Sequence, residues 1–172
     1  RDIWALKTLA INKRIQKFPE HQFKFAYYAK DLDQIKVLTL GKEVTKDEKW
    51  KNWGIPNSYI WDYWRYENSK CKNLMVVKSN KDSAILASLG YCAVTTQNES
   101  SSILIQNREK LEKICEKPII VYGSDEQGTN ESIKANKTLN WRYFNTKKKY
   151  LSKYGANDIA EVVRVFGLKR IK

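Results

Sequence analysis

The sequence predicts an α/β fold: a sheet of about four mainly parallel strands with helices on both faces, preceded by a small N-terminal α+β appendage. From residue 74 onward, short apolar runs of strand length alternate with segments of helical periodicity. The loops between them are short, which is typical of right-handed crossovers between parallel strands. The earlier residues are irregular and rich in Trp and Tyr. The strands are expected at residues 74–77, 92–95, 119–122 and 141–144.

Helices are expected between and after these strands. Residues 81–90 carry apolar side chains on one side and end in Gly90, a common helix terminator. The serines at 100–102 offer N-caps for a helix that keeps its apolar spacing until Pro118. Two further helices are expected at residues 125–139 and 157–166.

The composition fits one domain with a smaller appendage. The chain has 172 residues, 42% of them hydrophobic, so it can bury a core, and intrinsic disorder is excluded as its overall state. No apolar run approaches the roughly 20 residues of a membrane-spanning helix, so we expect a soluble protein with no membrane partner. We divide the chain into a basic, Trp- and Tyr-rich appendage, residues 1–73, and a sheet domain, residues 74–172.

Positive charge is the strongest compositional feature. The chain has 32 Lys and Arg against 19 Asp and Glu, a net charge of +13. A charge of this size attracts polyanions, of which nucleic acid is the commonest. The alternative is a lysine-rich chain whose charge only keeps it soluble.

The cysteines suggest no framework of bonds. Cys71, Cys92 and Cys115 stand at wide spacing beside a single histidine, His21. They assemble no convincing zinc site or disulfide pattern, so we expect an intracellular, reducing compartment. The chain starts at Arg1 without an apolar signal segment, which fits a processed mature form or part of a longer polypeptide. An organellar matrix and a phage-infected cytoplasm both agree with this.

Charged side chains follow three of the expected strands. In a parallel sheet the functional residues gather at the carboxyl ends of the strands, here residues 78–82, 95–99 and 123–128. Acidic residues followed by a glycine at a helix start can hold a divalent cation against a phosphate. The alternative is that Asp125 and Glu126 are ordinary first-turn residues that interact favourably with the helix dipole.

The order of these motifs resembles the Toprim domain of bacterial-type DNA primases, in particular its phage- and organelle-like primase-helicase branch. Val77–Asp82 (VKSNKD) resembles the first motif of that branch, TKSLKD, and Gly123–Gly128 (GSDEQG) resembles its DNDxxG motif. Tyr154–Ile159 resembles its KDISD segment. The similarity extends from about Phe25 to the end of the chain, and residues 49–52 and 59–61 resemble its basic lead-in, which contacts template.

The resemblance implies a Toprim-like, Rossmann-like sheet with a Mg²⁺ site and assigns roles to particular residues. Asp125, Glu126 and Glu99 would be metal ligands, and Lys78, Lys81 and Asp82 would be catalytic groups if the protein is active. One departure is important: Gly123 stands where the family places the first aspartate of its metal motif. Two-metal catalysis needs cations held on both reacting oxygens, so we expect weak Mg²⁺ binding at most, and no other cofactor.

These residues are consistent with two functions, one as a binding module and one as an enzyme. The first is a binding module that has lost catalysis and belongs to a larger nucleoprotein assembly, such as an organellar ribonucleoprotein like the mitochondrial ribosome. The alternative is an active Mg²⁺-dependent primase core that synthesises primers on single-stranded DNA. A Toprim nuclease is a poorer option because it needs the same missing acid. In each case the partner is DNA or RNA, and the first function adds other proteins.

Candidate nucleic-acid contacts combine basic and aromatic residues. Between residues 132 and 157 there are seven basic residues and no acid, interleaved with Trp141, Tyr143 and Tyr150. This mixture suits phosphate contact and base stacking, although a solvated loop would look similar. We expect Trp61 in the core, and for Trp50 and Trp53 we leave open whether they are core or surface residues. The candidate residues are Lys134, Lys137, Arg142, Lys147, Lys148, Lys149 and Lys153, with Lys49, Trp50 and Lys51 upstream.

Overall fold

The computed structural model describes residues 23–29, 34–40, 44–52 and 54–144. The chain divides into two compact units, Arg1–Ile55 and Pro56–Lys172, which are described separately. The division precedes the boundary that we expected at residue 73, because Ile60 and Cys71 belong to the core of the second unit. The helix expected at residues 157–166 lies outside the described residues.

The described part of the first unit is a three-stranded antiparallel sheet with a short helix. Its strands follow the order β1-β2-β3. Val37 and Leu38 of β2 are buried. A tight turn follows β3 at Gly54, whose φ of +72° favours glycine. The elements are β1 (Phe23–Ala29), β2 (Gln34–Leu40), α2 (Lys46–Lys49) and β3 (Trp50–Asn52).

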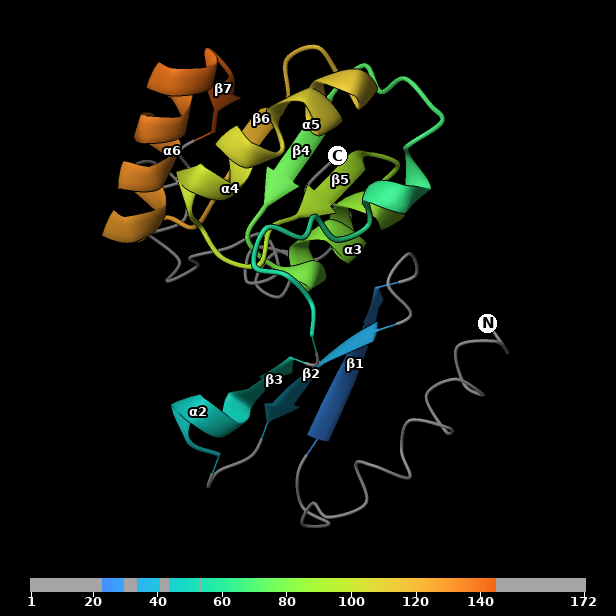
Figure 1. Ribbon diagram of the computed structural model, residues 1–172, viewed down its shortest axis with the longest axis vertical. Coiled ribbons are helices and arrows are strands. Elements are labelled where there is room, and N and C mark those ends of the chain that lie inside the picture. The colour runs from blue at the N-terminus through green and yellow to red at the C-terminus, as the bar shows by residue number, and fades with distance from the viewer. Residues whose placement is uncertain (1–22, 30–33, 41–43, 53, 145–172) are drawn as a thin grey trace. The chain divides into compact units, whose positions relative to one another are not determined.

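The second unit contains the predicted parallel sheet, with strand order β5-β4-β6-β7 (Figure 1). It confirms the expected α/β fold class. The strands are β4 (Leu74–Val77), β5 (Cys92–Thr95), β6 (Ile119–Val121) and β7 (Arg142–Tyr143). The helices are the 3₁₀ turn η1 (Tyr63–Arg65), α3 (Asn80–Ser88), α4 (Ser101–Gln106), α5 (Arg108–Ile114) and α6 (Glu126–Leu139).

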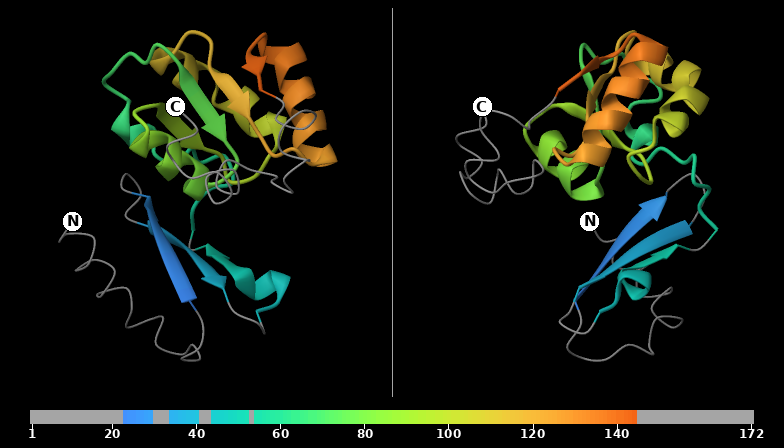
Figure 2. Two further views of the ribbon diagram at one scale, coloured as in Figure 1. Left: turned by 180° about the vertical axis from the view of Figure 1, so that it is seen from behind. Right: turned by 90° about the vertical axis from the view of Figure 1, so that its left-hand side faces the viewer.

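Helices cover both faces of this sheet. Successive strand residues point to opposite faces, so Leu74 and Val76 pack into one core cluster and Val77 into another. The larger cluster includes residues of α4, α5 and α6, and the smaller one includes Leu86 of α3. In Figures 1 and 2, α6 lies beside the edge strand β7.

One expected helix is divided in two. The sequence predicted a single helix from the serines at 100–102 to Pro118, but α4 ends and α5 begins around Asn107. The Asn107 side-chain amide donates to the carbonyl of Ser58 at 2.8 Å and to that of Ile103 at 2.9 Å. The break therefore allows a contact with a segment distant in sequence, which helical periodicity does not reveal.

The segment that precedes the sheet covers its β5 edge. Trp61 pairs with Thr95 through two backbone hydrogen bonds of 2.8 and 3.2 Å. The hydroxyl of Tyr66 accepts from the backbone N–H of Ala93 at 3.3 Å. Trp61 is 2% exposed, so the prediction that it belongs to the core is confirmed. Covering the edge in this way prevents strand pairing with another chain.

The structure corrects the prediction about cysteines. Cys71 and Cys92 form a disulfide, with Cα atoms 6.3 Å apart, and Cys115 is free and buried. Cys71 lies just before β4 and Cys92 begins β5, and these two strands are neighbours. Parallel pairing therefore brings together cysteines that the sequence separates.

In the part of the chain that the structure describes, no helix combines the length and the apolar character needed to cross a bilayer.

Candidate functional site

The carboxyl ends of the central strands bring together Lys78, Glu99, Gly123 and Asp125. The Lys78 Nζ atom lies 3.9 Å from Glu99 Oε1 and 3.9 Å from Asp125 Oδ2. Glu99 Oε1 also accepts a hydrogen bond from the backbone N–H of Gly123 at 2.5 Å. The Glu99 side chain is 13% exposed and that of Asp125 is 55% exposed. Only the Asp125 carboxylate is therefore well solvated.

Two glycines make room for the Glu99 carboxylate. A Cβ atom at Gly123 would overlap Lys78 Nζ and lie 2.8 Å from Glu99 Oε1. A Cβ atom at Gly128 would overlap the carbonyl oxygen of Gly123 and lie 2.7 Å from the same Glu99 oxygen. The strand end and the start of α6 can therefore approach this closely only without side chains at these two positions.

Asp125 has a structural task as well as a charge. It is the N-cap of α6, and its Oδ1 atom accepts from the backbone N–H of Gly128 at 2.8 Å. Its second carboxylate oxygen faces Lys78. A capping aspartate typically contributes about 1 kcal/mol to helix stability. Glu126, the other predicted ligand on this loop, is exposed in the first turn of α6.

The first strand end forms a capping arrangement. Ser79 is the N-cap of α3, and its hydroxyl accepts from the backbone N–H of Asp82 at 3.2 Å. The same hydroxyl lies 2.6 Å from Asp82 Oδ2, to which it donates. Asp82 is 2% exposed, whereas Lys81 is exposed. The Ser79 and Asp82 spacing therefore has a structural explanation, and Lys81 remains available for contacts from outside.

Sequence analysis did not single out a polar layer beneath these residues. Burial raises the pKa of the Tyr122 hydroxyl; a hydrogen bond from Thr96 opposes that rise and the charges of Glu99 and Glu131 add to it. Glu131 accepts from the backbone N–H of Ser101 at 2.7 Å, and bonding to Ser101 lowers the pKa of its carboxyl group. Glu131 thus joins α6 to the start of α4. Tyr122 directly follows β6, and its place at the end of the apolar run 119–122 was its only signal in the sequence.

These residues do not suit a metal ion held by several carboxylates. Among the residues that the structure describes, no three His, Cys, Asp or Glu side chains are grouped so that they could hold a metal. Glu99 and Asp125 face the Lys78 ammonium, and Gly123 supplies no carboxylate. The predicted set of Asp125, Glu126 and Glu99 is therefore not assembled as a ligand set in this arrangement.

The predicted nucleic-acid contacts divide into three groups. Lys134, Lys137 and Arg142 are exposed on α6 and β7, and Lys49 and Lys51 are exposed in the first unit. Trp50 lies in β3. The remaining candidates, Lys147, Lys148, Lys149 and Lys153, lie outside the described residues.

Trp141 does not provide a stacking surface. It is 1% exposed, and its indole N–H donates to Glu112 Oε1 at 2.9 Å. The prediction that Trp141 stacks on bases is therefore wrong: its apolar ring packs in the core, although its neighbours in sequence are basic. Tyr143 is 37% exposed and keeps a surface position.

The net positive charge is distributed unevenly along the chain. Residues 56–144 contain 12 basic and 10 acidic residues, whereas residues 145–172 contain eight basic and two acidic ones. The described part of the second unit is therefore nearly balanced in charge. Most of the net positive charge therefore lies in residues 1–55 and 145–172.

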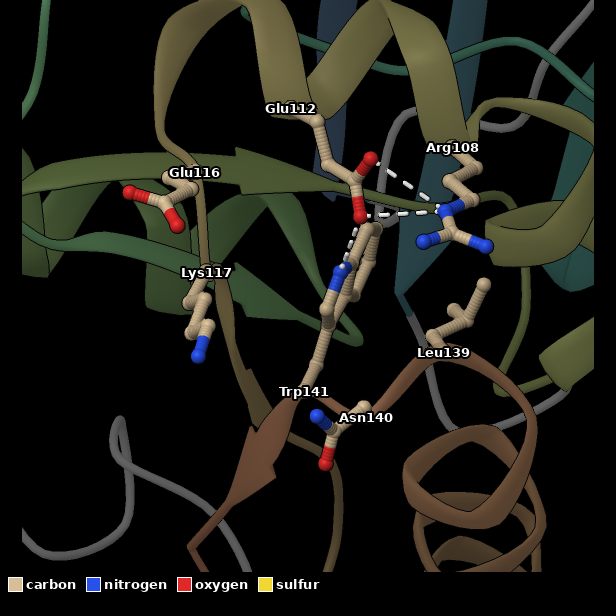
Figure 3. Close-up of a pocket in the computed structure, with 7 residues that line it drawn as sticks. All are labelled: Arg108, Glu112, Glu116, Lys117, Leu139, Asn140 and Trp141. Carbon is tan, nitrogen blue, oxygen red and sulfur yellow. Dashed lines mark hydrogen bonds and ion pairs between the residues drawn. The ribbon is translucent and has the colours of Figure 1, made fainter.

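A separate pocket lies at the opposite end of the sheet, next to the starts of β6 and β7. It has a volume of about 300 Å³. Figure 3 shows Glu112 at its centre, between the Trp141 indole and the Arg108 guanidinium, whose Nε atom donates at 3.1 Å. The Arg108 guanidinium and the Glu112 carboxylate of this pocket form an ion pair. The lining residues are Arg108, Glu112, Glu116, Lys117, Leu139, Asn140 and Trp141.

In its fold this chain is similar to solved catalytic domains of DNA primases. The chain is similar to the primase fragment of the bacteriophage T7 primase-helicase protein, with a TM-score of 0.63 and 17% identity over 87% of this chain. It is equally similar to the DnaG catalytic core, with a TM-score of 0.63 and 16% identity over 94% of this chain.

A third structure, the DnaG primase catalytic domain bound to single-stranded DNA, has a TM-score of 0.58 and 16% identity over 94% of this chain. The chain spans 59%, 61% and 62% of the lengths of these three proteins. At such identities the likeness concerns the fold. No family model and no curated protein sequence matches the chain.

Proposed function

We propose that this chain is a nucleic-acid-binding domain related to DNA primases that has lost metal-dependent primer synthesis. One observation carries the proposal. At the strand end where the primase resemblance places an aspartate, Gly123 lies against Lys78 and Glu99, which fill the space of the missing side chain. Nucleotide transfer by a two-metal mechanism requires carboxylates that hold both cations in place. The site supplies an ammonium at that place instead.

Two observations support nucleic-acid binding: the positive net charge of the chain and the similarity of its fold to that of a primase domain bound to DNA. The net charge of +13 favours a polyanionic partner. A similar primase domain has been captured with single-stranded DNA. We infer that the terminal parts of the chain, where basic residues are in excess, make most phosphate contacts. We further propose that the chain belongs to a larger assembly, such as an organellar ribonucleoprotein.

Binding should weaken steeply as salt increases, because lysine–phosphate contacts release counterions. Replacing Lys147, Lys148 and Lys149 together by alanine should reduce the slope of log K against log salt by roughly two to three. Fluorescence anisotropy with labelled single-stranded DNA and RNA measures this slope. The matched control replaces three exposed lysines near the opposite end of the sheet, Lys72, Lys113 and Lys117. A slope that changes equally in both triple variants would contradict a specific role for the first three.

Primer synthesis should be absent. With a single-stranded template, nucleotides and Mg²⁺ or Mn²⁺, we expect no extension product above that of a template-free control. The competing function is an active primase core, in which Asp125, Glu126 and Glu99 would hold the cations. Template-dependent synthesis that disappears in Asp125→Ala would establish that function and overturn our proposal.

A further inference from the structure

At the described strand ends a single ammonium, that of Lys78, faces two carboxylates. We propose that the Lys78 ammonium takes the place of a divalent cation, so that Glu99 and Asp125 need no metal. The ammonium lies 3.9 Å from an oxygen of each carboxylate. It is mostly buried, with a side-chain exposure of 21%. A positive group held between two carboxylates lowers their mutual repulsion as a metal ion would.

A side chain at position 123 would overlap the Lys78 ammonium as the structure places it. The ammonium occupies the place where a Cβ atom on Gly123 would project, and Glu99 Oε1 is 2.8 Å from the same point. Any side chain there must displace the lysine. The glycine and the partly buried ammonium therefore belong to one arrangement, in which the ammonium occupies the space that a side chain at position 123 would need.

The two carboxylates have further partners in the backbone. Glu99 accepts from the N–H of Gly123 at 2.5 Å, and Asp125 accepts from the N–H of Gly128 at 2.8 Å. Hydrogen bonds to charged groups are stronger than those between neutral groups. A metal ion that entered would compete with these donors and would meet the like charge of the ammonium. Both effects disfavour its binding.

This inference rests on the proposed function in one respect, the absence of metal chemistry at this site, and it adds the physical cause. It also implies that Mg²⁺ does not contribute to the stability of the fold. Neither statement depends on whether the chain binds nucleic acid. The test can therefore use the protein without DNA or RNA.

The test is a titration of the full chain with Mn²⁺, followed by electron paramagnetic resonance of the free ion. The wild type should bind no more tightly than about 1 mM, the range of weak oxygen-ligand sites. Lys78→Met combined with Gly123→Asp removes the ammonium and supplies a third carboxylate, so it should bind at least about tenfold more tightly. Lys113→Met, which removes an exposed lysine at the opposite end of the sheet, should behave like the wild type.

Thermal unfolding gives a second readout that does not require the double variant to fold. Lys78→Met alone should lower Tm by about 2–4 °C, and 5 mM Mg²⁺ should recover part of that loss while leaving the wild-type Tm unchanged. Two results would overturn the inference: micromolar Mn²⁺ binding by the wild type, or a Lys78→Met variant with wild-type Tm and Mn²⁺ affinity.

The two proposals fail separately. Tight Mn²⁺ binding by the wild type without primer synthesis would refute the ammonium substitution and leave the binding function intact. Loss of measurable nucleic-acid binding, with Lys78→Met behaving as expected, would refute the function and leave the substitution intact.

Discussion

Replacing Trp141 by alanine should lower the free energy of unfolding by about 3–5 kcal/mol, the usual cost of removing a large buried aromatic side chain. The ring is 1% exposed and belongs to the same core cluster as Leu111 and Leu139. Its N–H also donates to Glu112 at 2.9 Å, so the alanine variant loses a hydrogen bond to a charged group as well as packing. Urea denaturation followed by circular dichroism measures the change.

Two further variants distinguish the contribution of packing from that of the hydrogen bond to Glu112. Trp141→Phe keeps an aromatic ring but removes the N–H donor, so it should cost much less than alanine. Tyr143→Ala, two residues further on, removes a side chain that is 37% exposed and should change stability by no more than about 0.5 kcal/mol. A Trp141→Ala variant of wild-type stability with reduced nucleic-acid affinity would contradict the buried position and restore the stacking interpretation.

The basic residues around Trp141 predicted a surface position, but the Trp141 ring is buried. The basic run from residue 132 to 157 predicted a surface, and Lys134, Lys137 and Arg142 are indeed exposed. Trp141 follows α6 and immediately precedes β7, where the chain turns back into the sheet. Burial of a large apolar ring outweighs the polarity of its neighbours in sequence.

The sheet itself could be predicted because its signals are local. Apolar runs such as residues 74–77 and 92–95 have strand length, and the helices between them carry caps. The break at Asn107 could not be predicted, since its partner at Ser58 is distant in sequence. For the same reason the disulfide between Cys71 and Cys92 could not be predicted, because the pairing of β4 with β5 brings the two cysteines together.

At the strand ends, topology was predictable and side-chain geometry was not. The carboxyl ends of neighbouring parallel strands meet, so the proximity of Lys78, Glu99 and Asp125 follows from the order of the motifs. The sequence showed that Gly123 lacks a carboxylate. It did not show that the Lys78 ammonium lies in the space of the missing side chain, because that depends on the direction of a long flexible side chain.

Replacing Cys71 by serine should lower the free energy of unfolding by about 3 kcal/mol under non-reducing conditions. The disulfide between Cys71 and Cys92 closes a loop with a sequence separation of 21. A cross-link over that separation lowers the conformational entropy of the unfolded chain, which stabilises the folded state by about 3 kcal/mol. The disulfide also ties the segment before β4 to the start of β5. Urea denaturation with and without dithiothreitol measures the effect, and reduction should bring the wild type close to the variant.

Cys115→Ser is the matched control, since Cys115 is buried in the same core cluster but lies outside the disulfide. Relative to the wild type under the same conditions, the Cys115→Ser variant should lose a similar free energy of unfolding with and without reductant. Thiol titration gives an independent measurement: the unfolded, unreduced wild type should show one reactive thiol, and the reduced protein three. Three thiols without reduction, together with stability insensitive to dithiothreitol, would contradict the disulfide. That result would instead support the reducing compartment predicted from the wide spacing of the cysteines.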